Sequence, residues 1–316
     1  MAELAVKKII SPAPHFDSGV ATPKIMLTVV ISLAPLVIYG TYLFGARALI
    51  TVAVSVASCV VFESLFRKLT RQDTRAKDFS AVVSGILLAL VMPPSIAVWQ
   101  VILGALFAMI VAKEFFGGLG ANVFNPALSG RAFMFVSFPA AMAAWTQPHD
   151  AVSAATTLAS VYGTAEGGDF SYLTYFLGNR AGCIGETSIL LILLAFVFLL
   201  ITKTIDWRAP VAMLAVTAAL SGIAGVNPIA ALMTGGVFFG AVFMTTDYAT
   251  APVTKAGRLV FGAGCGLITF LIRKFGGYPE GVMFSILIMN ILVPFLNNII
   301  PHKYGFVKPQ KAEVKK

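Results

Sequence analysis

The chain has 316 residues, of which 58% are hydrophobic and only 12% are charged, and its net charge is +9. Soluble domains carry about 25% charged residues, so this composition excludes an ordinary soluble protein and predicts an integral membrane protein. The positive charge does not indicate nucleic-acid binding, because the basic residues cluster at the ends of apolar runs and none of the basic stretches is interleaved with aromatic residues.

Ten apolar segments are long enough to enter a bilayer, and an even number of spans places both termini on one side. Lysine and arginine are concentrated in the N-terminal arm, in alternate connections and in the tail, which predicts that this side is cytoplasmic. The predicted spans are 24–44, 47–66, 79–93, 97–116, 129–145, 188–204, 210–226, 229–245, 258–275 and 280–300. The predicted regions are a cytoplasmic arm (1–23), a first five-helix repeat (24–145), an external polar loop (146–187), a second five-helix repeat (188–300) and a cytoplasmic basic tail (301–316).

The two sets of five spans are predicted to be inverted repeats. The stretch "SGILLALVMPP" is similar to "GGVFFGAVFMTT", and "MIVAKEFFGGLG" is similar to "TFLIRKFGGYPEG", five spans later in each case. An odd offset inverts the second copy, which makes Lys113 and Arg273 equivalent residues at opposite surfaces. The third and eighth spans end in Met92-Pro93-Pro94 and in Met244-Thr245-Thr246-Asp247, so we expect broken helices there that line a cavity.

The cysteines and histidines limit the redox chemistry of this chain. Cys59, Cys183 and Cys265 are isolated from one another, so they do not by themselves form an iron–sulfur or structural zinc site. The three histidines all lie outside the apolar runs, which argues against a haem held by two histidines in the bilayer. If the chain carries electrons, we expect an organic carrier.

The strip "DAVSAAT" (Asp150–Thr156) lies in the external loop and has almost no bulky side chain. A threonine hydroxyl forms a stable ester once it is modified. On spacing alone, the strip is explained better by a helix N-cap at Asp150 or Ser153 than by a modified threonine.

The same strip resembles the D-x-x-(S/T)-G-A-T motif at which a flavin transferase attaches FMN to threonine in the RnfD/NqrB family of membrane subunits. The resemblance covers nearly the whole chain and includes "KEFFGGLGANVFNPALSGRAF", "FMTTDYATAPVT" and "LVFGAGCGLITFLIRKFGGYPEGVMFSILIMN". The short N-terminal arm and the total length look more like RnfD, of the ferredoxin:NAD complex, whereas "NPALSGRAF" is close to the wording of NqrB, of the quinone-reducing complex.

The register of the motif places a covalent FMN on Thr156, with Thr157 as the alternative. The rest of the attachment motif is Asp150, Ser153, Ala154 and Ala155, and Ala154 stands where the family usually has glycine. The resemblance implies an electron-relaying subunit in the cell membrane of a bacterium or archaeon, with the flavin loop on the outer face. It also implies a non-covalent riboflavin in the membrane part, Na⁺ or H⁺ as the transported ion, iron–sulfur subunits and a second flavinylated subunit as partners, and a flavin transferase for maturation.

Carboxylates in apolar surroundings are candidates for a cation path. They are Asp247, Glu280, Glu114 and Asp78, and each lies near the end of a span, where a solvated interfacial carboxylate is the commoner case. Asp247 is the preferred candidate because it follows a predicted helix break. Asn122 and Asn125, in "GANVFNPA", are interpreted either as a second flavin site or as caps of the fourth and fifth spans. A secondary transporter or channel without a redox role fits the repeat equally well.

Overall fold

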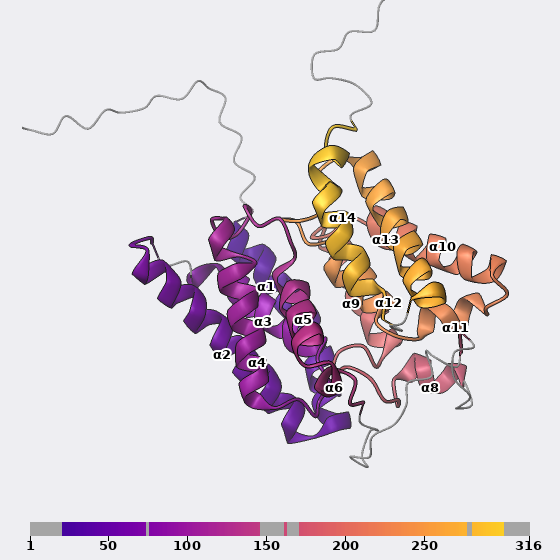
Figure 1. Cartoon of the computed structure of the whole chain (residues 1–316), viewed down its shortest axis with the longest axis horizontal. Coiled ribbons are helices and arrows are strands. Elements are labelled where there is room, and N and C mark those ends of the chain that lie inside the picture. The colour runs from indigo at the N-terminus through magenta and orange to yellow at the C-terminus, as the bar shows by residue number, and fades with distance from the viewer. Residues whose placement is uncertain (1–20, 74–75, 146–160, 163–170, 277–279, 300–316) are drawn as a thin grey trace, which may run out of the picture.

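The computed structural model describes residues 21–73, 76–145, 161–162, 171–276 and 280–299, and within these ranges the regular elements are helices. In Figure 1 the helices before residue 145 lie on one side of the molecule and α9 to α14 lie on the other. The first group consists of α1 (Thr22–Phe44), α2 (Ala46–Leu69), η1 (Ala76–Asp78), α3 (Ser80–Leu90), α4 (Val98–Leu106), η2 (Phe107–Val111), η3 (Glu114–Phe116), α5 (Pro126–Ser137) and α6 (Pro139–Met142). The second group consists of α8 (Tyr172–Leu177), α9 (Ile189–Ile201), α10 (Arg208–Ile223), α11 (Pro228–Met233), α12 (Val237–Phe239), η4 (Gly240–Met244), α13 (Lys255–Phe275) and α14 (Val282–Leu296).

Four helices are long and apolar enough to cross a membrane: α1, α2, the continuous segment Val98–Phe116 and α13. Shorter apolar helices are α3, α9, α10 and α14. Many large hydrophobic side chains on these helices are exposed, among them Ile38, Leu69 and Phe275, at 70%, 75% and 77%. Exposed apolar belts of this kind face lipid, so the chain is a multi-pass membrane protein.

Side-chain caps and prolines determine where several helices begin. Asn125 accepts a hydrogen bond from the Leu128 amide, and Pro126 follows it as the first residue of α5. Asn227 and Pro228 begin α11 in the same way. Both pairs follow the rule that asparagine caps a helix and proline occupies its first position. The fifth span therefore starts at residue 126, three residues before the predicted start.

Glycines allow neighbouring helices to approach closely. A side chain on Gly266 of α13 would lie 2.6 Å from the carbonyl oxygen of Met213 in α10, and one on Gly85 of α3 would lie 2.7 Å from the Cα of Val56 in α2. Gly262 and Gly266 form a G-x-x-x-G pair, the spacing that lets membrane helices pack backbone against backbone.

The third and eighth apolar segments both end where breaks were expected, at Leu90 and at Met244, and the eighth has a further interruption at residues 234–236 that was not predicted. The first, α3, ends at Leu90, and the carbonyl oxygens of Leu90 and Met92 accept hydrogen bonds from Gly185 and Ile184 at 2.8 and 3.2 Å. Residues 183–187 had been assigned to the external loop, but they are buried against this end of α3. Thus residues from the second half of the sequence satisfy the free carbonyls of a helix in the first half.

The second interruption separates α11 from α12 at residues 234–236. There the Arg273 guanidinium donates to the carbonyl oxygens of Ala231 and Thr234 at 2.7 and 3.1 Å. Arg180 donates to the carbonyl oxygen of Met233 at 2.5 Å. Two guanidinium groups therefore replace the missing helical donors at this break.

Candidate functional site

The predicted flavin strip lies outside the described residues. This applies to Asp150, Ser153, Ala154, Ala155, Thr156 and the alternative Thr157. The structure therefore bears on the membrane part alone, and the flavin attachment stays a prediction.

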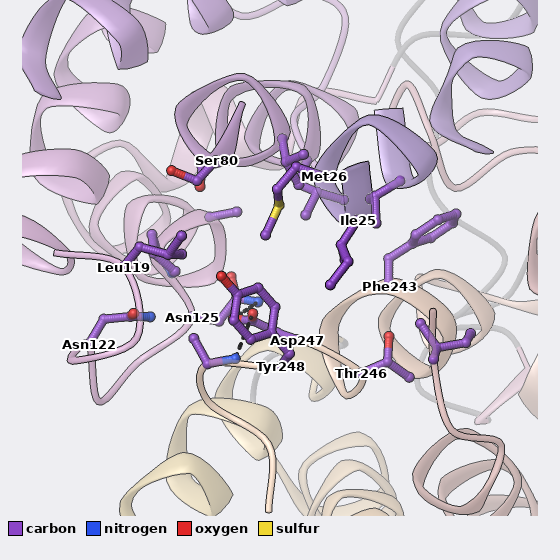
Figure 2. Close-up of a pocket in the computed structure, with 18 of the residues that line it drawn as sticks. Ile25, Met26, Ser80, Leu119, Asn122, Asn125, Phe243, Thr246, Asp247 and Tyr248 are labelled. Atoms are coloured by element: carbon purple, nitrogen blue, oxygen red, sulfur yellow. Dashed lines mark hydrogen bonds between the residues drawn. The ribbon is translucent and has the colours of Figure 1, made fainter. Parts of the chain in front are cut away.

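A cavity of about 80 Å³ brings together three of the residues that the sequence singled out, Asn122, Asn125 and Asp247. Figure 2 shows Asn125 beside Asp247 near the centre of the cavity, with Asn122 to one side. The walls come from α1, α3, the start of α5, the end of α9 and the segment after η4. The other polar groups of the lining are Ser80, Ser84, Lys113, Thr204, Thr246 and Tyr248.

Asp247 is half-buried in this cavity and lies in the turn that follows η4. Its carboxylate accepts hydrogen bonds from the Thr250 hydroxyl at 2.9 Å, from the Ala249 amide at 3.3 Å and from Asn125 Nδ2 at 3.4 Å. In the part of the chain that the structure describes, none of its hydrogen bonds or ion pairs involves a cationic side chain. Neutral donors therefore contact the carboxylate directly, and the charge of Lys113, in the same cavity, acts on it without an ion pair. A carboxylate placed in this way in a membrane protein is a candidate for cation binding.

The two asparagines play different roles. Asn125 caps α5, as one of the two interpretations expected, and it also joins the first half of the chain to Asp247 in the second. Asn122 holds a turn, since its Oδ1 accepts from the Gly120 amide and its Nδ2 donates to the Phe124 carbonyl. Both line the cavity, but about 80 Å³ is far below the 300–1,000 Å³ of typical pockets for drug-sized ligands. The residues present thus fit a small ion with water, and they do not fit a flavin ring.

The expectation that Glu114 is a solvated interfacial carboxylate is wrong. Glu114 is 4% exposed and forms an ion pair with Arg67 at 3.2 Å. Beside it, Lys113 forms an ion pair with Glu63 at 2.7 Å and donates to the Ser80 hydroxyl at 2.8 Å. Glu63 was not predicted from the sequence. It is the only acidic residue in α2, and a single carboxylate within an apolar run is the signal that marks it.

Lys113 and Arg273 had been expected at opposite surfaces, and both are instead buried, at 1% and 3% exposure. Each cation faces a short apolar segment of its own half: Lys113 binds Ser80 of α3, and Arg273 binds the carbonyl oxygen of Ala231 in α11. A charge at these positions therefore satisfies buried polar groups.

Arg131 of α5 holds a second buried cluster, which sequence reasoning did not find. Its guanidinium forms ion pairs with Glu186, at 3.0 Å, and with Glu280. Glu280 is thus paired inside the protein, with its side chain 15% exposed, and the expectation that it is interfacial is wrong. Cys183 lies within 4.8 Å of both carboxylates, and its thiol donates to the Val91 carbonyl at 3.2 Å. Because the Arg131 guanidinium is bound by both carboxylates, the group is arranged as an ion-pair cluster and not as a metal centre.

Asp78, the remaining carboxylate considered, is half-buried and caps the start of α3 by accepting a hydrogen bond from the Ser80 amide at 2.8 Å. It therefore has a structural role at a helix end.

Comparison with known proteins identifies relatives over almost the full length. A family model described as the NQR2, RnfD, RnfE family matches residues 9–305. The chain is 40% identical over 307 residues to the D subunit of the Na⁺-translocating ferredoxin:NAD⁺ oxidoreductase complex of Acetobacterium woodii, and the match covers 96% of each chain. It is 38% identical over 328 residues to the D subunit of the proton-translocating ferredoxin:NAD⁺ oxidoreductase complex of Clostridium ljungdahlii, covering 96% of this chain and 99% of that protein. It is 36% identical over 324 residues to the D subunit of the ion-translocating oxidoreductase complex of Stutzerimonas stutzeri, covering 89% and 92%.

Proposed function

Because this chain belongs to the NQR2, RnfD, RnfE family, we propose that it is the D subunit of an ion-translocating ferredoxin:NAD oxidoreductase complex. The observation that carries the proposal is the end-to-end match to relatives with this name, 40% and 38% identical. The activity belongs to the assembly and not to this subunit alone. The scattered cysteines support this division, since the iron–sulfur centres then lie in partner subunits.

The electron carrier in this subunit is FMN joined through a phosphoester bond to Thr156. This assignment is supported by the similarity of "DAVSAAT" to the attachment motif, from which it departs at Ala154, where the family usually has glycine. A transferase attaches the flavin on the outer side of the membrane, and a second flavinylated subunit exchanges electrons with it. No flavin is assigned to the cavity at Asn125, because its volume does not fit one.

The membrane part consists of two inverted halves of five spans each, with both termini cytoplasmic. The contacts of Lys113 and Arg273 support this arrangement. When "SGILLALVMPP" is aligned with "GGVFFGAVFMTT", Ser80 and Ala231 occupy equivalent positions. Each of these residues is bound by the buried cation of its own half, so the two halves share a contact as well as a sequence pattern.

The flavin assignment is tested by peptide mass spectrometry across residues 132–180 and by in-gel flavin fluorescence after denaturation. The wild type and Thr157→Val are expected to carry the mass of FMN, and Thr156→Val is expected to lack it while the protein remains in the membrane. Flavin retained in Thr156→Val and lost in Thr157→Val moves the site by one residue. If the wild-type peptide has no added mass, the proposed flavin relay is wrong, and the chain is then a scaffold or a transporter.

Asp247 is the cation-binding group of the path through this subunit. Its support is its position in a polar cavity between the two halves, with Asn125 and Thr250 as neutral neighbours. Relatives named for Na⁺ and for protons are almost equally similar to this chain, so sequence identity does not indicate which ion is transported. In vesicles that contain the whole complex, Asp247→Asn is expected to lower ion uptake at least tenfold while the rate of flavin reduction changes less than twofold. If ion uptake by Asp247→Asn is unchanged, Asp247 is not part of the cation path.

A further inference from the structure

A second cavity, of about 310 Å³, opens beside the ends of α9, α10 and α13. It adjoins the Asp247 cavity but excludes Asp247 and Asn125 from its walls. Its size falls within the range of pockets that hold small ligands. The lining residues are Lys203, Thr204, Ile205, Asp206, Ala209, Thr245, Thr246, Tyr248, Ala251, Pro252, Val253 and Arg258.

The charges on the wall favour an anion. Asp206 is the only carboxylate among the lining residues, and it accepts hydrogen bonds from Arg208 Nη1 at 2.6 Å and from Arg258 Nη1 at 2.8 Å. Partial burial alone would raise the pKa of Asp206, but the amide and guanidinium groups of these arginines outweigh it and lower the pKa below its usual value. The acid is therefore ionised, and two arginines share its single negative charge. Lys203 adds a further positive charge to the wall, so the charges around the cavity sum to a positive value.

Lys203 is placed by an uncommon backbone conformation. Its φ is +54°, in the left-handed region that side chains other than glycine, asparagine and aspartate rarely adopt. The turn is held by hydrogen bonds from the Lys203 amide to Leu200 and from the Thr204 amide to Leu199, both at 3.0 Å. No carboxylate in the described ranges forms an ion pair with Lys203, so its ammonium is available to a ligand.

Apolar side chains in the wall, or close to wall residues in the sequence, are exposed and are called the rim here. Val253 of the wall is 74% exposed, and Ile201 and Trp207, close in sequence to Lys203 and Asp206, are 75% and 49% exposed. Exposed tryptophan next to a helix end is typical of the level of the lipid headgroups. A soluble anion has no use for an apolar rim, whereas an amphiphile with a charged head and hydrocarbon chains uses both surfaces.

We propose that this cavity binds the headgroup of an anionic phospholipid. The lipid phosphate lies against the Lys203 ammonium, and the Thr204 hydroxyl of the wall contacts another headgroup oxygen. The acyl chains run along Ile201 and Val253 on the outside of the protein. A basic pocket beside membrane helices suits anionic lipids, because their phosphate gains a charge-assisted hydrogen bond from the lysine. In a zwitterionic lipid the headgroup's own cation already neutralises the phosphate, so the gain is smaller.

The test compares lipid binding by the full chain in nanodiscs of phosphatidylcholine with and without phosphatidylglycerol of the same acyl chains. Native mass spectrometry counts the retained phosphatidylglycerol, and thermal unfolding gives the shift in Tm that this lipid causes. Lys203→Asn removes the charge and keeps a residue that tolerates the left-handed backbone. The matched control is Lys274→Asn, which removes an exposed lysine at the far end of α13.

We expect Lys203→Asn to lose at least half of the retained phosphatidylglycerol and of the Tm shift, and Lys274→Asn to keep both. The lipid count does not depend on stability, so it is decisive if Lys203→Asn also lowers the Tm in phosphatidylcholine alone. Three results overturn the proposal: unchanged binding by Lys203→Asn, an equal loss in Lys274→Asn, or the full Tm shift with inorganic phosphate in phosphatidylcholine. None of these results depends on flavin or on the complex, so the proposed function is tested separately.

Discussion

Arg131 shows how much a single buried residue holds together in this protein. It lies on α5, and its partners Glu186 and Glu280 follow α8 and precede α14, respectively. Inside a protein, a pair of opposite charges adds little net stability over well-packed apolar groups, but removal of one partner leaves the other charge buried and unpaired. The cluster is therefore sensitive to the loss of any one member.

Arg131→Leu is expected to destabilise the protein by about 3–5 kcal/mol, because both carboxylates lose their counter-ion in a buried site. Thermal unfolding in detergent measures the effect, with Lys274→Leu as the exposed control, which is expected to change stability by less than about 0.5 kcal/mol. Adding Glu186→Gln and Glu280→Gln to Arg131→Leu removes the orphaned charges and is expected to restore part of the loss. If Arg131→Leu unfolds at the wild-type temperature, the ion pairs do not stabilise the fold.

Asp206 gives the protein a dependence on pH. Its pKa is lower in the folded protein than in the unfolded chain, where it is about 3.9, so its pairing stabilises the fold above that value. This contribution is lost as the pH falls through the lower, folded value. Asp206→Asn is therefore expected to unfold at a lower temperature than the wild type at pH 7, with a gap that narrows below about pH 4. A gap that is constant from pH 7 to pH 3 contradicts this assignment.

At the level of residues, the sequence indicates chemistry better than it indicates contacts. Asp247 and Asn125 were both singled out, but their contact joins positions 122 residues apart, which no local pattern reports. Glu114 and Glu280 were assigned to the interface because they lie near span ends. Their partners, Arg67 and Arg131, stand on other helices, so burial of these carboxylates becomes visible only after the helices are packed.

The helices themselves were predictable where the sequence carries strong breakers. Pro93 and Pro94 follow the end of the third apolar segment, and the eighth ends at Met244, before Thr245 and Thr246, as expected. The interruption at residues 234–236 was not predicted, although Gly235 and Gly236 are its signal in the sequence. The start of α5 was placed three residues late because the apolar run was given more weight than the Asn125-Pro126 cap. The return of residues 183–187 into the interior was not predictable, because their polar composition is typical of a loop and their partners lie in α3 and α5.

The contact between α10 and α13 depends on one face of α13 having no side chains. Gly266→Ala is expected to destabilise the protein by about 1–3 kcal/mol, because its methyl group meets the Met213 carbonyl of α10 and the helices must separate. Gly264→Ala is the matched control in the same helix, since its methyl group meets only the flexible Met289 side chain. Thermal unfolding of the two variants measures the difference. Alanine has a higher helix propensity than glycine, so propensity alone would stabilise both variants. Equal losses would mean that the close approach to the Met213 carbonyl does not determine the effect.

Taken as a whole, the molecule is joined across its two halves by polar contacts at two levels. One is the Asn125–Asp247 contact at the cavity, and the other is the Arg131 cluster at the ends of the interrupted helices.

The proposed orientation of the whole chain is testable by labelling single cysteines with a membrane-impermeant thiol reagent. Cys59, Cys183 and Cys265 are all buried, at 0% exposure, so the wild type is expected to give a low background in intact cells. Lys68→Cys and Lys255→Cys replace exposed lysines in connections predicted to be cytoplasmic, whereas Lys274→Cys lies beyond α13 on the side predicted to be external.

In intact cells we expect labelling of Lys274→Cys alone, and in inverted vesicles we expect labelling of Lys68→Cys and Lys255→Cys. All three are expected to react after detergent is added, which controls for exposure. This pattern requires α13 to cross the membrane and requires the connection after α2 to share a side with the one before α13, as inverted halves demand. Labelling of Lys68→Cys and Lys274→Cys from the same side would contradict the inverted arrangement, because the second copy would then keep the orientation of the first.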